Sequence, residues 1–218
     1  MTKEHKCGQP GGLFDPGRLD HRNAESTRLK ILLAAFEEIH EKGFQSASLA
    51  NILIRTGLTN GAQYHHFPNK QALGYAVVDE LVAEKIRQDW QAPLEGAGNP
   101  IDALVAIIEK AGSIINERDI QLGCPGNNLA QEMSPVDEGF RIRIETIMSN
   151  WRGSIADALR EGQAKGHVRL DIDPNGTGVM LVATLEGCMG LAKNAQDREI
   201  LMQCGESLIY FLNSLRQT

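Results

Sequence analysis

The sequence predicts an all-α fold of about nine helices, with a small N-terminal domain of three helices and a larger helical C-terminal domain. Leu, Ile and Ala dominate the apolar residues, and aromatic residues make up 5 % of the chain. This balance favours helices over a β-sandwich. Apolar residues recur at helical spacing, and no segment shows the sustained alternation of a strand. The 218 residues can bury a sizeable core.

The first helix is expected from about Ala24 to Lys42. Gly43 follows it, and glycine commonly ends a helix in the left-handed conformation. Residues 1–23 contain several prolines and glycines, so we expect a flexible arm there. The apolar positions of the helix fall on one face and are Leu29, Leu32, Leu33, Phe36 and Ile39.

Two short helices around a tight turn are expected next, at Leu49–Thr56 and Asn60–His66. Ser48 is expected to cap the first, because its hydroxyl can satisfy a free backbone N–H. Gly57 ends that helix, and Thr59 is expected to cap the second. Such a pair, closed by a glycine turn, is typical of a helix–turn–helix.

The fourth helix is expected from Lys70 to about Gln91, and it connects the N-terminal domain, residues 24–70, with the C-terminal domain, residues 71–218. A break rich in proline and glycine follows. The later helices are expected at about Ile101–Glu117, Asn128–Met133, Val136–Lys165, Asn175–Asn194 and Asp197–Leu215.

The charge is unevenly distributed along the chain. Residues 1–75 contain nine Lys and Arg against seven Asp and Glu, whereas residues 76–218 contain thirteen against twenty-one. Phosphates respond to the local potential. The net charge of −6 is therefore compatible with DNA binding by the N-terminal domain.

The predicted helix–turn–helix carries side chains suited to DNA. The second helix of such a motif enters the major groove, and its N-terminus attracts phosphate. The amides of Asn60 and Gln63 suit adenine, and Lys70 suits a phosphate. Tyr64 and His65 can donate to phosphates or touch a base. The predicted DNA contacts are Ser48, Thr59, Asn60, Gly61, Gln63, Tyr64, His65 and Lys70.

Each of these side chains also has a simpler interpretation. Asn60 and Gln63 are equally compatible with ordinary solvated positions, and Tyr64 with the core. The adjacent pair His65 and His66 does not suggest a metal site, because neighbours on a helix point about 100° apart. The ordered set, rather than any single residue, indicates DNA binding.

The segments ILLAAFEEIHEKGF and TGLTNGAQYHHFPNKQAL resemble the N-terminal domain of the TetR family of bacterial transcriptional regulators, over about residues 25–75. The resemblance implies a homodimer that binds double-stranded operator DNA through its N-terminal helices and a small effector through its C-terminal domain. The family commonly has lysine at the position of Asn60 and a small or apolar residue at that of Gln63. These departures leave the operator sequence open.

The last two helices mix small and large apolar residues, which lets helices approach closely. Gly187 and Gly190 are examples, beside Leu185 and Leu191. The resemblance implies that these two helices form a four-helix interface in a homodimer. An ordinary monomeric core is the alternative.

The effector pocket is expected among the C-terminal helices. Methionine adapts to varied ligands but is equally a core filler. Glu186 lies in an apolar stretch where an unpaired carboxylate is costly; it can orient a ligand, pair across the dimer or face solvent. Asn128 and Gln131 are further polar candidates. The predicted lining residues are Met133, Phe140, Ile144, Met148, Trp151, Met180, Glu186 and Met189.

The cysteines Cys7, Cys124, Cys188 and Cys204 are scattered, without metal-binding spacing. We expect free thiols in a cytoplasmic protein. Cys124 lies in a Gly-Cys-Pro-Gly turn, where it can act as a redox or electrophile sensor or be inert. No neighbouring Lys, Arg or His lowers its pKa.

The sequence therefore predicts a ligand-responsive repressor that binds a palindromic operator as a dimer and is released by a small-molecule effector. A ligand-dependent activator and a cysteine-based sensor are the alternatives. No acid–base pair or nucleophile–base set indicates an enzyme. No cofactor or metal is expected. No apolar run approaches the roughly 20 residues that span a bilayer, and no signal core begins the chain.

Overall fold

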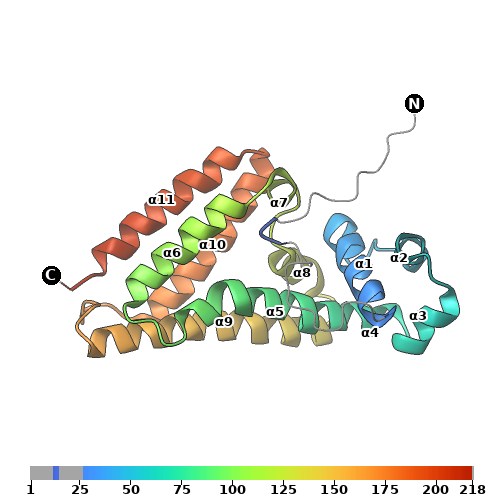
Figure 1. Cartoon of the computed structure of the whole chain (residues 1–218), viewed down its shortest axis with the longest axis horizontal. Helices are drawn as coiled ribbons and strands as arrows, with labels where there is room; N and C mark the ends of the chain where they lie inside the picture. Colours follow the sequence, from blue (N-terminus) through green and yellow to red (C-terminus); the bar gives the residue numbers. More distant parts are fainter. Residues whose placement is uncertain (1–11, 15–26, 218) are drawn as a thin grey trace.

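The computed structural model describes residues 12–14 and 27–217 (Figure 1). The predicted all-α fold is confirmed, because the described residues contain helices and no strand, apart from one isolated bridge between Val168 and Arg216. The N-terminal domain lies at one end of the elongated molecule, and the C-terminal helices form the rest.

The N-terminal domain consists of α1 (Thr27–Lys42), α2 (Leu49–Thr56) and α3 (Asn60–His66). The bounds of α2 and α3 are those expected from the sequence. The side chains of Ile31 and Leu32 on α1 are fully buried and belong to the main hydrophobic core.

A continuous helical segment leads from the N-terminal domain along the body of the protein (Figure 1). The side chain of Asn69 caps its start by accepting a hydrogen bond from the Ala72 N–H at 2.7 Å. Two stretches within it are π-helical, and a short 3-10 turn ends it. The consecutive parts are α4 (Lys70–Ala76), η2 (Val77–Val82), α5 (Ala83–Ile86), η3 (Arg87–Gln91) and η4 (Ala92–Leu94).

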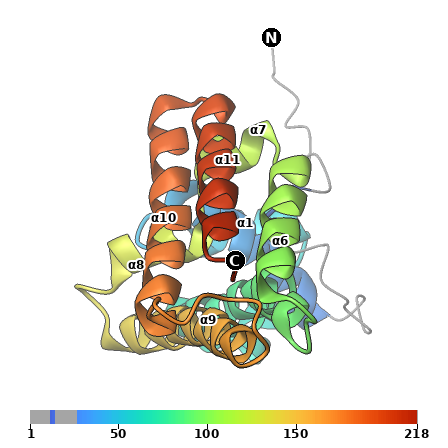
Figure 2. The same cartoon turned by 90° about the vertical axis from the view of Figure 1, so that its left-hand side faces the viewer.

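The remaining helices form the body of the C-terminal domain. Figure 2 shows α6, α10 and α11 side by side, with α9 crossing beneath them. The helices are α6 (Pro100–Ile114), α7 (Glu117–Leu122), α8 (Pro125–Met133), α9 (Glu138–Ala164), α10 (Pro174–Ala195) and α11 (Arg198–Ser214).

Helix α7 corrects the sequence analysis, which continued the preceding helix to Glu117. The backbone leaves the helical conformation at Ile115, whose ψ is 133°. Asn116 and Asp119 then form a reciprocal capping box that starts a new helix. Such a box satisfies two free N–H groups at once.

The two domains share one hydrophobic core. At the joint, the Phe140 ring on α9 lies 4.6 Å from the Phe44 ring of the N-terminal domain and 5.0 Å from the Tyr75 ring on α4, between ring centroids. Tyr75 and the side chain of Gln71 also donate hydrogen bonds to Asp137 at 2.7 and 2.6 Å. The N-terminal domain is thus packed onto α9 and the residue that caps it.

Most of the expected arm, including residues 1–11 and 15–23, lies outside the described residues. The described part, Gly12 to Phe14, lies against α7. The backbone N–H groups of Leu13 and Phe14 donate to the two carboxylate oxygens of Asp119 at 2.7 and 3.3 Å. The Leu13 side chain is buried in a small cluster with Ile115, Ile120 and Met189.

The expectation that all cysteines are free thiols is wrong for two of them. Cys188 on α10 and Cys204 on α11 form a disulfide, with 6.3 Å between their Cα atoms. These helices run side by side in opposite directions (Figure 2), which brings together cysteines separated by 16 positions. Cys124 is a free, buried thiol, and Cys7 lies outside the described residues.

Candidate functional site

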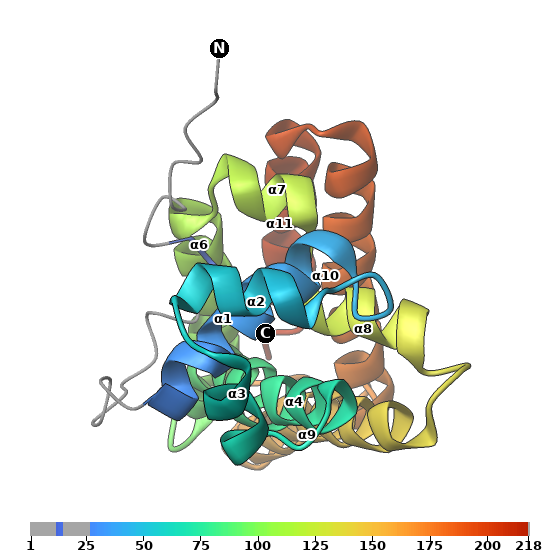
Figure 3. The same ribbon diagram turned by 90° about the vertical axis from the view of Figure 1, so that its right-hand side faces the viewer.

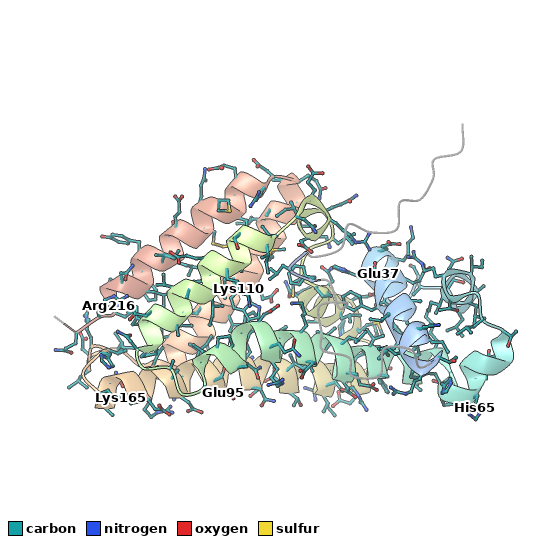
Figure 4. The ribbon with its side chains drawn as sticks, viewed as in Figure 1. Glu37, His65, Glu95, Lys110, Lys165 and Arg216 are labelled. Carbon is teal, nitrogen blue, oxygen red and sulfur yellow. A yellow bond between two sulfur atoms is a disulfide. The ribbon has the colours of Figure 1, made fainter. Side chains whose placement is uncertain are left out.

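Helix α3 lies at the end of the molecule opposite α11 (Figure 1), the end that faces the viewer in Figure 3 and carries the labelled His65 in Figure 4. Thr59, Gly61 and His65 are exposed, and the Tyr64 side chain is 56 % exposed although it is large and partly apolar. The side chains of Asn60 and Gln63 lie outside the described residues. The predicted DNA contacts on α3 whose exposure is described, Gly61, Tyr64 and His65, therefore face solvent.

A buried carboxylate on α1 fixes the orientation of α2. Glu38 is 1 % exposed. It accepts hydrogen bonds from the Ser48 N–H at 3.3 Å, from Asn51 Nδ2 at 2.8 Å and from the Arg55 guanidinium at 3.2 Å. Arg55 also pairs with Glu41 on α1 at 2.5 Å. These bonds hold the first helix of the motif against α1.

Ser48 does lie at the N-cap of α2, but its side chain makes no capping hydrogen bond. This corrects the expected role of its hydroxyl. Glu38 was missed as an organising residue, although it follows Ile31 and Ala35 at helical spacing. A carboxylate on a face that is otherwise apolar was the signal in the sequence.

The turn between α2 and α3 forms as expected. Gly57 has a φ of 66°, in the left-handed region, and its N–H donates to the Leu53 carbonyl at 2.9 Å. No atom of another residue would lie within 4 Å of a Cβ at Gly57. Glycine is required there by the backbone conformation rather than by space.

Lys70 braces the loop between α1 and α2. Its Nζ donates to the Gln45 carbonyl at 2.9 Å and lies 4.9 Å from the centroid of the Phe44 ring. Partial burial lowers the pKa of its ammonium. Across the loop, Glu132 on α8 accepts the N–H groups of Phe44 and Gln45, each at 2.8 Å. The C-terminal domain therefore holds this loop directly.

A buried histidine makes a second connection between the domains. His40 Nε2 on α1 lies 2.8 Å from the carbonyl oxygen of Gly123, in the turn between α7 and α8. Burial lowers the pKa of His40 to about 4. The imidazole is therefore neutral at pH 7, and Nε2 donates to the carbonyl. Arg118 on α7 adds an ion pair to Glu41 at 3.0 Å.

The C-terminal domain contains an apolar cavity of about 390 Å³, a size typical of small-molecule sites. Helices α6, α9, α10 and α11 contribute to its wall, and Leu13 and Phe14 from the N-terminal segment complete it. Trp151, Glu186 and Met189, all predicted as pocket residues, line this cavity. Sequence reasoning missed the other aromatic wall, Trp90, whose ring lies 5.1 Å from that of Trp151 between centroids.

The other predicted pocket residues do not line this cavity. Met133, Phe140 and Ile144 are buried in the main core, and Met148 and Met180 pack against it. Helical spacing identified these residues as facing inward, but it does not separate the core from the wall of a cavity.

Two polar atoms in the wall are buried and lack a hydrogen-bond partner: Nε1 of Trp151 and Oε2 of Glu186. Burial raises the pKa of Glu186 to about 7. The Cys124 thiol lies in hydrogen-bonding reach of this carboxyl; burial and then the charge of Glu186 raise its pKa well above the usual range. Buried polar atoms without partners are costly, and both atoms belong to residues that line the cavity.

A second hollow, of about 590 Å³, lies between α1 and α8 and includes His40, Asn128, Gln131 and Glu132. Several of its polar groups, including Asn128, Glu132 and His40, already have partners. The Asn128 amide donates to the Leu122 carbonyl at 2.7 Å and accepts from Lys193 at 3.0 Å. The apolar cavity is therefore the stronger candidate for a small-molecule site.

His40 and Glu186 give opposite pH dependences to the free energy of unfolding. The pKa of His40 is lower in the folded state, so the unfolded chain holds more protons between pH 4 and 6.5, and stability rises with pH there. The pKa of Glu186 is higher in the folded state, so stability falls between pH 4.5 and 7. Each contribution is at most on the order of 3 kcal/mol.

We therefore expect Glu186→Gln to steepen the rise of stability with pH, and His40→Gln, which keeps a donor for Gly123, to reduce it. Urea denaturation at several pH values between 4.5 and 7 measures both differences from the wild type. A difference that stays constant across this range would contradict the assigned pKa of the residue concerned.

Two family models match the chain. One, described as bacterial regulatory proteins of the tetR family, matches residues 31–77. The other, a tetracyclin repressor-like C-terminal domain, matches residues 100–206. The chain belongs to the TetR family. It is a member of a family of transcriptional regulators, as the resemblance of the helix–turn–helix indicated.

Known proteins agree with this membership over most of the chain. The transcriptional regulator AcuR of Cereibacter sphaeroides is 28 % identical over 193 residues, covering 88 % of this chain and 84 % of AcuR. The repressor DhaR of a Mycobacterium species is 27 % identical over 163 residues, covering 75 % of this chain and 80 % of DhaR. A TetR regulator from Chloroflexus aurantiacus superposes with a TM-score of 0.78 at 24 % identity, covering 91 % of this chain and all of the other.

Within residues 12–14 and 27–217, no helix has the length and apolar character to cross a membrane. The same residues contain no group of three or more His, Cys, Asp or Glu that could hold a metal ion.

Proposed function

We propose that this TetR-family member is a repressor that binds an inverted-repeat operator as a homodimer and releases it when a small effector enters the apolar cavity. The observation that carries the proposal is the short connection between that cavity and α1. Glu186 in the cavity wall faces the Cys124 thiol, and the preceding residue, Gly123, accepts the hydrogen bond of His40. The similarity to DhaR, a named repressor, supports the direction of control.

The turn at Gly123 and Cys124 couples the cavity to the N-terminal domain. Cys124 contacts Glu186 in the cavity wall, and the adjacent Gly123 contacts His40 on α1. A ligand that pairs with Glu186 changes the contact of Cys124, and a shift of the turn moves the carbonyl that holds His40. The loop held by Glu132 on α8 moves with it, since α8 begins directly after Cys124. A ligand can shift this equilibrium only if it binds the two states with different affinity.

The proposed dimer interface lies on α10 and α11. Val179 and Leu191 on α10 are 53 % and 61 % exposed, and Tyr210 on α11 is 80 % exposed. Gly187 and Gly190 lie on the same open side of α10, with no atom within 4 Å of an added Cβ. Apolar residues with small neighbours suit close packing against a second copy. A two-fold dimer presents two recognition helices to half-sites about 34–36 Å apart.

Two rival functions use the same sites. An activator differs only in which state binds DNA, and a reporter measured with and without effector separates it from a repressor. A sensor based on Cys124 is disfavoured because the thiol is buried and its pKa is raised, whereas reactive cysteines are exposed and have a lowered pKa.

Tyr64→Ala is expected to weaken operator binding by about 10- to 100-fold, the effect typical of one lost contact in such an interface. The exposed side chain lies on α3 away from the core, so the thermal stability should stay unchanged. Fluorescence anisotropy with a labelled inverted-repeat fragment measures the affinity, and its decrease with salt reports the phosphate contacts.

Leu170→Ala is the matched control, because Leu170 is also large and exposed, at 77 %, but belongs to the C-terminal domain. Its operator affinity should equal that of the wild type. If the Tyr64→Ala variant bound operator with the affinity of the wild type, the assignment of α3 to the DNA interface would be wrong.

A further inference from the structure

The polar atoms of the cavity restrict which ligands fit. The indole N–H of Trp151 is a donor only, its side chain is 2 % exposed, and it has no partner. A ligand that leaves this N–H unpaired does not recover its cost of burial. A ligand that brings a hydrogen-bond acceptor to this N–H is therefore favoured over one that brings none.

The second unpaired atom, Oε2 of Glu186, further restricts the class of ligand that the cavity favours. Burial favours the neutral carboxylic acid, and the pKa of about 7 leaves a large neutral fraction at pH 7. The neutral acid can donate its O–H. Trp151 and Glu186, both in the wall of one cavity, are then two possible donors, and a carbonyl oxygen, which has two lone pairs, can accept from both.

The charged groups around the cavity lie at exposed positions. Glu109 on α6 and Arg198 and Glu206 on α11 line it, and all three are exposed. Cys124, before α8, is the other titratable group near Glu186, and its raised pKa keeps it neutral. The inner wall is therefore apolar, with the rings of Trp90 and Trp151 against it.

We propose that the cavity takes an uncharged carbonyl compound, such as a ketone, lactone or ester, whose apolar body lies against Trp90 and Trp151 and whose carbonyl oxygen accepts hydrogen bonds from Trp151 and Glu186. This assignment rests on the proposed function only in treating the cavity as the effector site. An organic cation is the main competitor, since ionised Glu186 can pair with it, but a cation leaves the indole N–H without an acceptor.

The chain provides its own reporter for this test. It contains two tryptophans, Trp90 and Trp151, and both line the cavity. Quenching of tryptophan fluorescence by a bound ketone therefore reports binding in this cavity, on the full chain and without DNA, and recovery of the fluorescence reports displacement of the ketone by another compound.

Four probes with one carbon skeleton separate the ligand classes: cyclooctanone, cyclooctanol, cyclooctylamine and cyclooctane. At pH 6 we expect cyclooctanone to bind about tenfold more tightly than cyclooctane, as one or two neutral hydrogen bonds allow, and cyclooctylammonium to bind most weakly. From pH 6 to pH 8 the affinity for cyclooctanone should fall by up to about tenfold, as Glu186 loses its proton.

Two variants assign the donors. Trp151→Phe keeps a ring but removes the N–H, so the preference for cyclooctanone over cyclooctane should fall by about fivefold, with Trp90 as reporter. Glu186→Gln keeps a donor that does not ionise, so cyclooctanone should bind with no dependence on pH. Glu199→Gln is the control, because Glu199 is exposed on α11 and does not line the cavity, and both properties should remain those of the wild type.

Tighter binding of cyclooctylammonium than of cyclooctanone, equal binding of all four probes, or no binding of any would overturn the assignment. So would a pH dependence that survives Glu186→Gln. Operator binding is measured separately. If cyclooctanone binds as expected but never releases operator, the ligand class stands and the release model fails. If another ligand releases operator and the four probes do not bind in the expected order, the ligand class fails and the release model stands.

Discussion

Gly187→Arg is expected to abolish specific operator binding while leaving the protomer folded. Gly187 is exposed on α10, and no atom lies within 4 Å of a Cβ at this position, so the protomer has space for the new side chain. In the proposed dimer, the two-fold axis brings two arginines into one apolar interface, where burying unpaired charge is strongly unfavourable. A monomer loses the linkage of two half-site contacts, which is worth about 10²- to 10⁴-fold in affinity.

Analytical ultracentrifugation measures the oligomeric state, circular dichroism the helix content, and anisotropy the operator affinity. Gly153→Arg is the matched control, since Gly153 is also in a helix, α9, and has no atom within 4 Å of an added Cβ. It lies outside the proposed interface and should remain a dimer that binds operator. A Gly187→Arg variant that sediments as a dimer would exclude this face of α10 as the interface.

Phe140→Ala is expected to have the largest effect on stability, lowering the free energy of unfolding by about 3–5 kcal/mol. Phe140 is 0 % exposed and lies between Phe44 and Tyr75. Removing its ring leaves a cavity at the joint between the domains. Because Phe44 belongs to the loop held by Glu132 and Lys70, the N-terminal domain should also lose its fixed orientation.

Chemical denaturation at fixed protein concentration measures this change. Ile142→Ala on the same helix is the control, because Ile142 is 51 % exposed, and it should cost much less. A loss for Phe140→Ala no larger than that of the control would contradict the described packing. The milder Phe140→Leu should leave cyclooctanone binding unchanged, because Phe140 does not line the cavity.

Local signals account for the parts of the fold that the sequence predicted well. Gly57 closes α2 and Pro68 follows α3, so those helices have the expected bounds. Helix α7 was missed because Ile115 extends the apolar pattern past the true end of α6 at Ile114. The short-range capping signal at Asn116 competed with that pattern and determines the structure.

Long-range pairing explains what the sequence could not predict about the sites. Glu132 holds backbone atoms of Phe44 and Gln45, almost ninety positions earlier, and no local pattern identifies such a partner. Helix α9 is similarly ambiguous. Its apolar residues include Phe140 in the core and Trp151 at the cavity, and periodicity does not distinguish these two environments.

The short segment anchored by Asp119 has a consequence for how ligand preference can change. Leu13 and Phe14 form part of the cavity wall, yet they precede α1 and belong to no helix. Shortening or exchanging this stretch alters the shape of the chamber while every helix keeps its sequence. Selectivity can therefore evolve, or be engineered, from the beginning of the chain without disturbing the framework that contacts DNA.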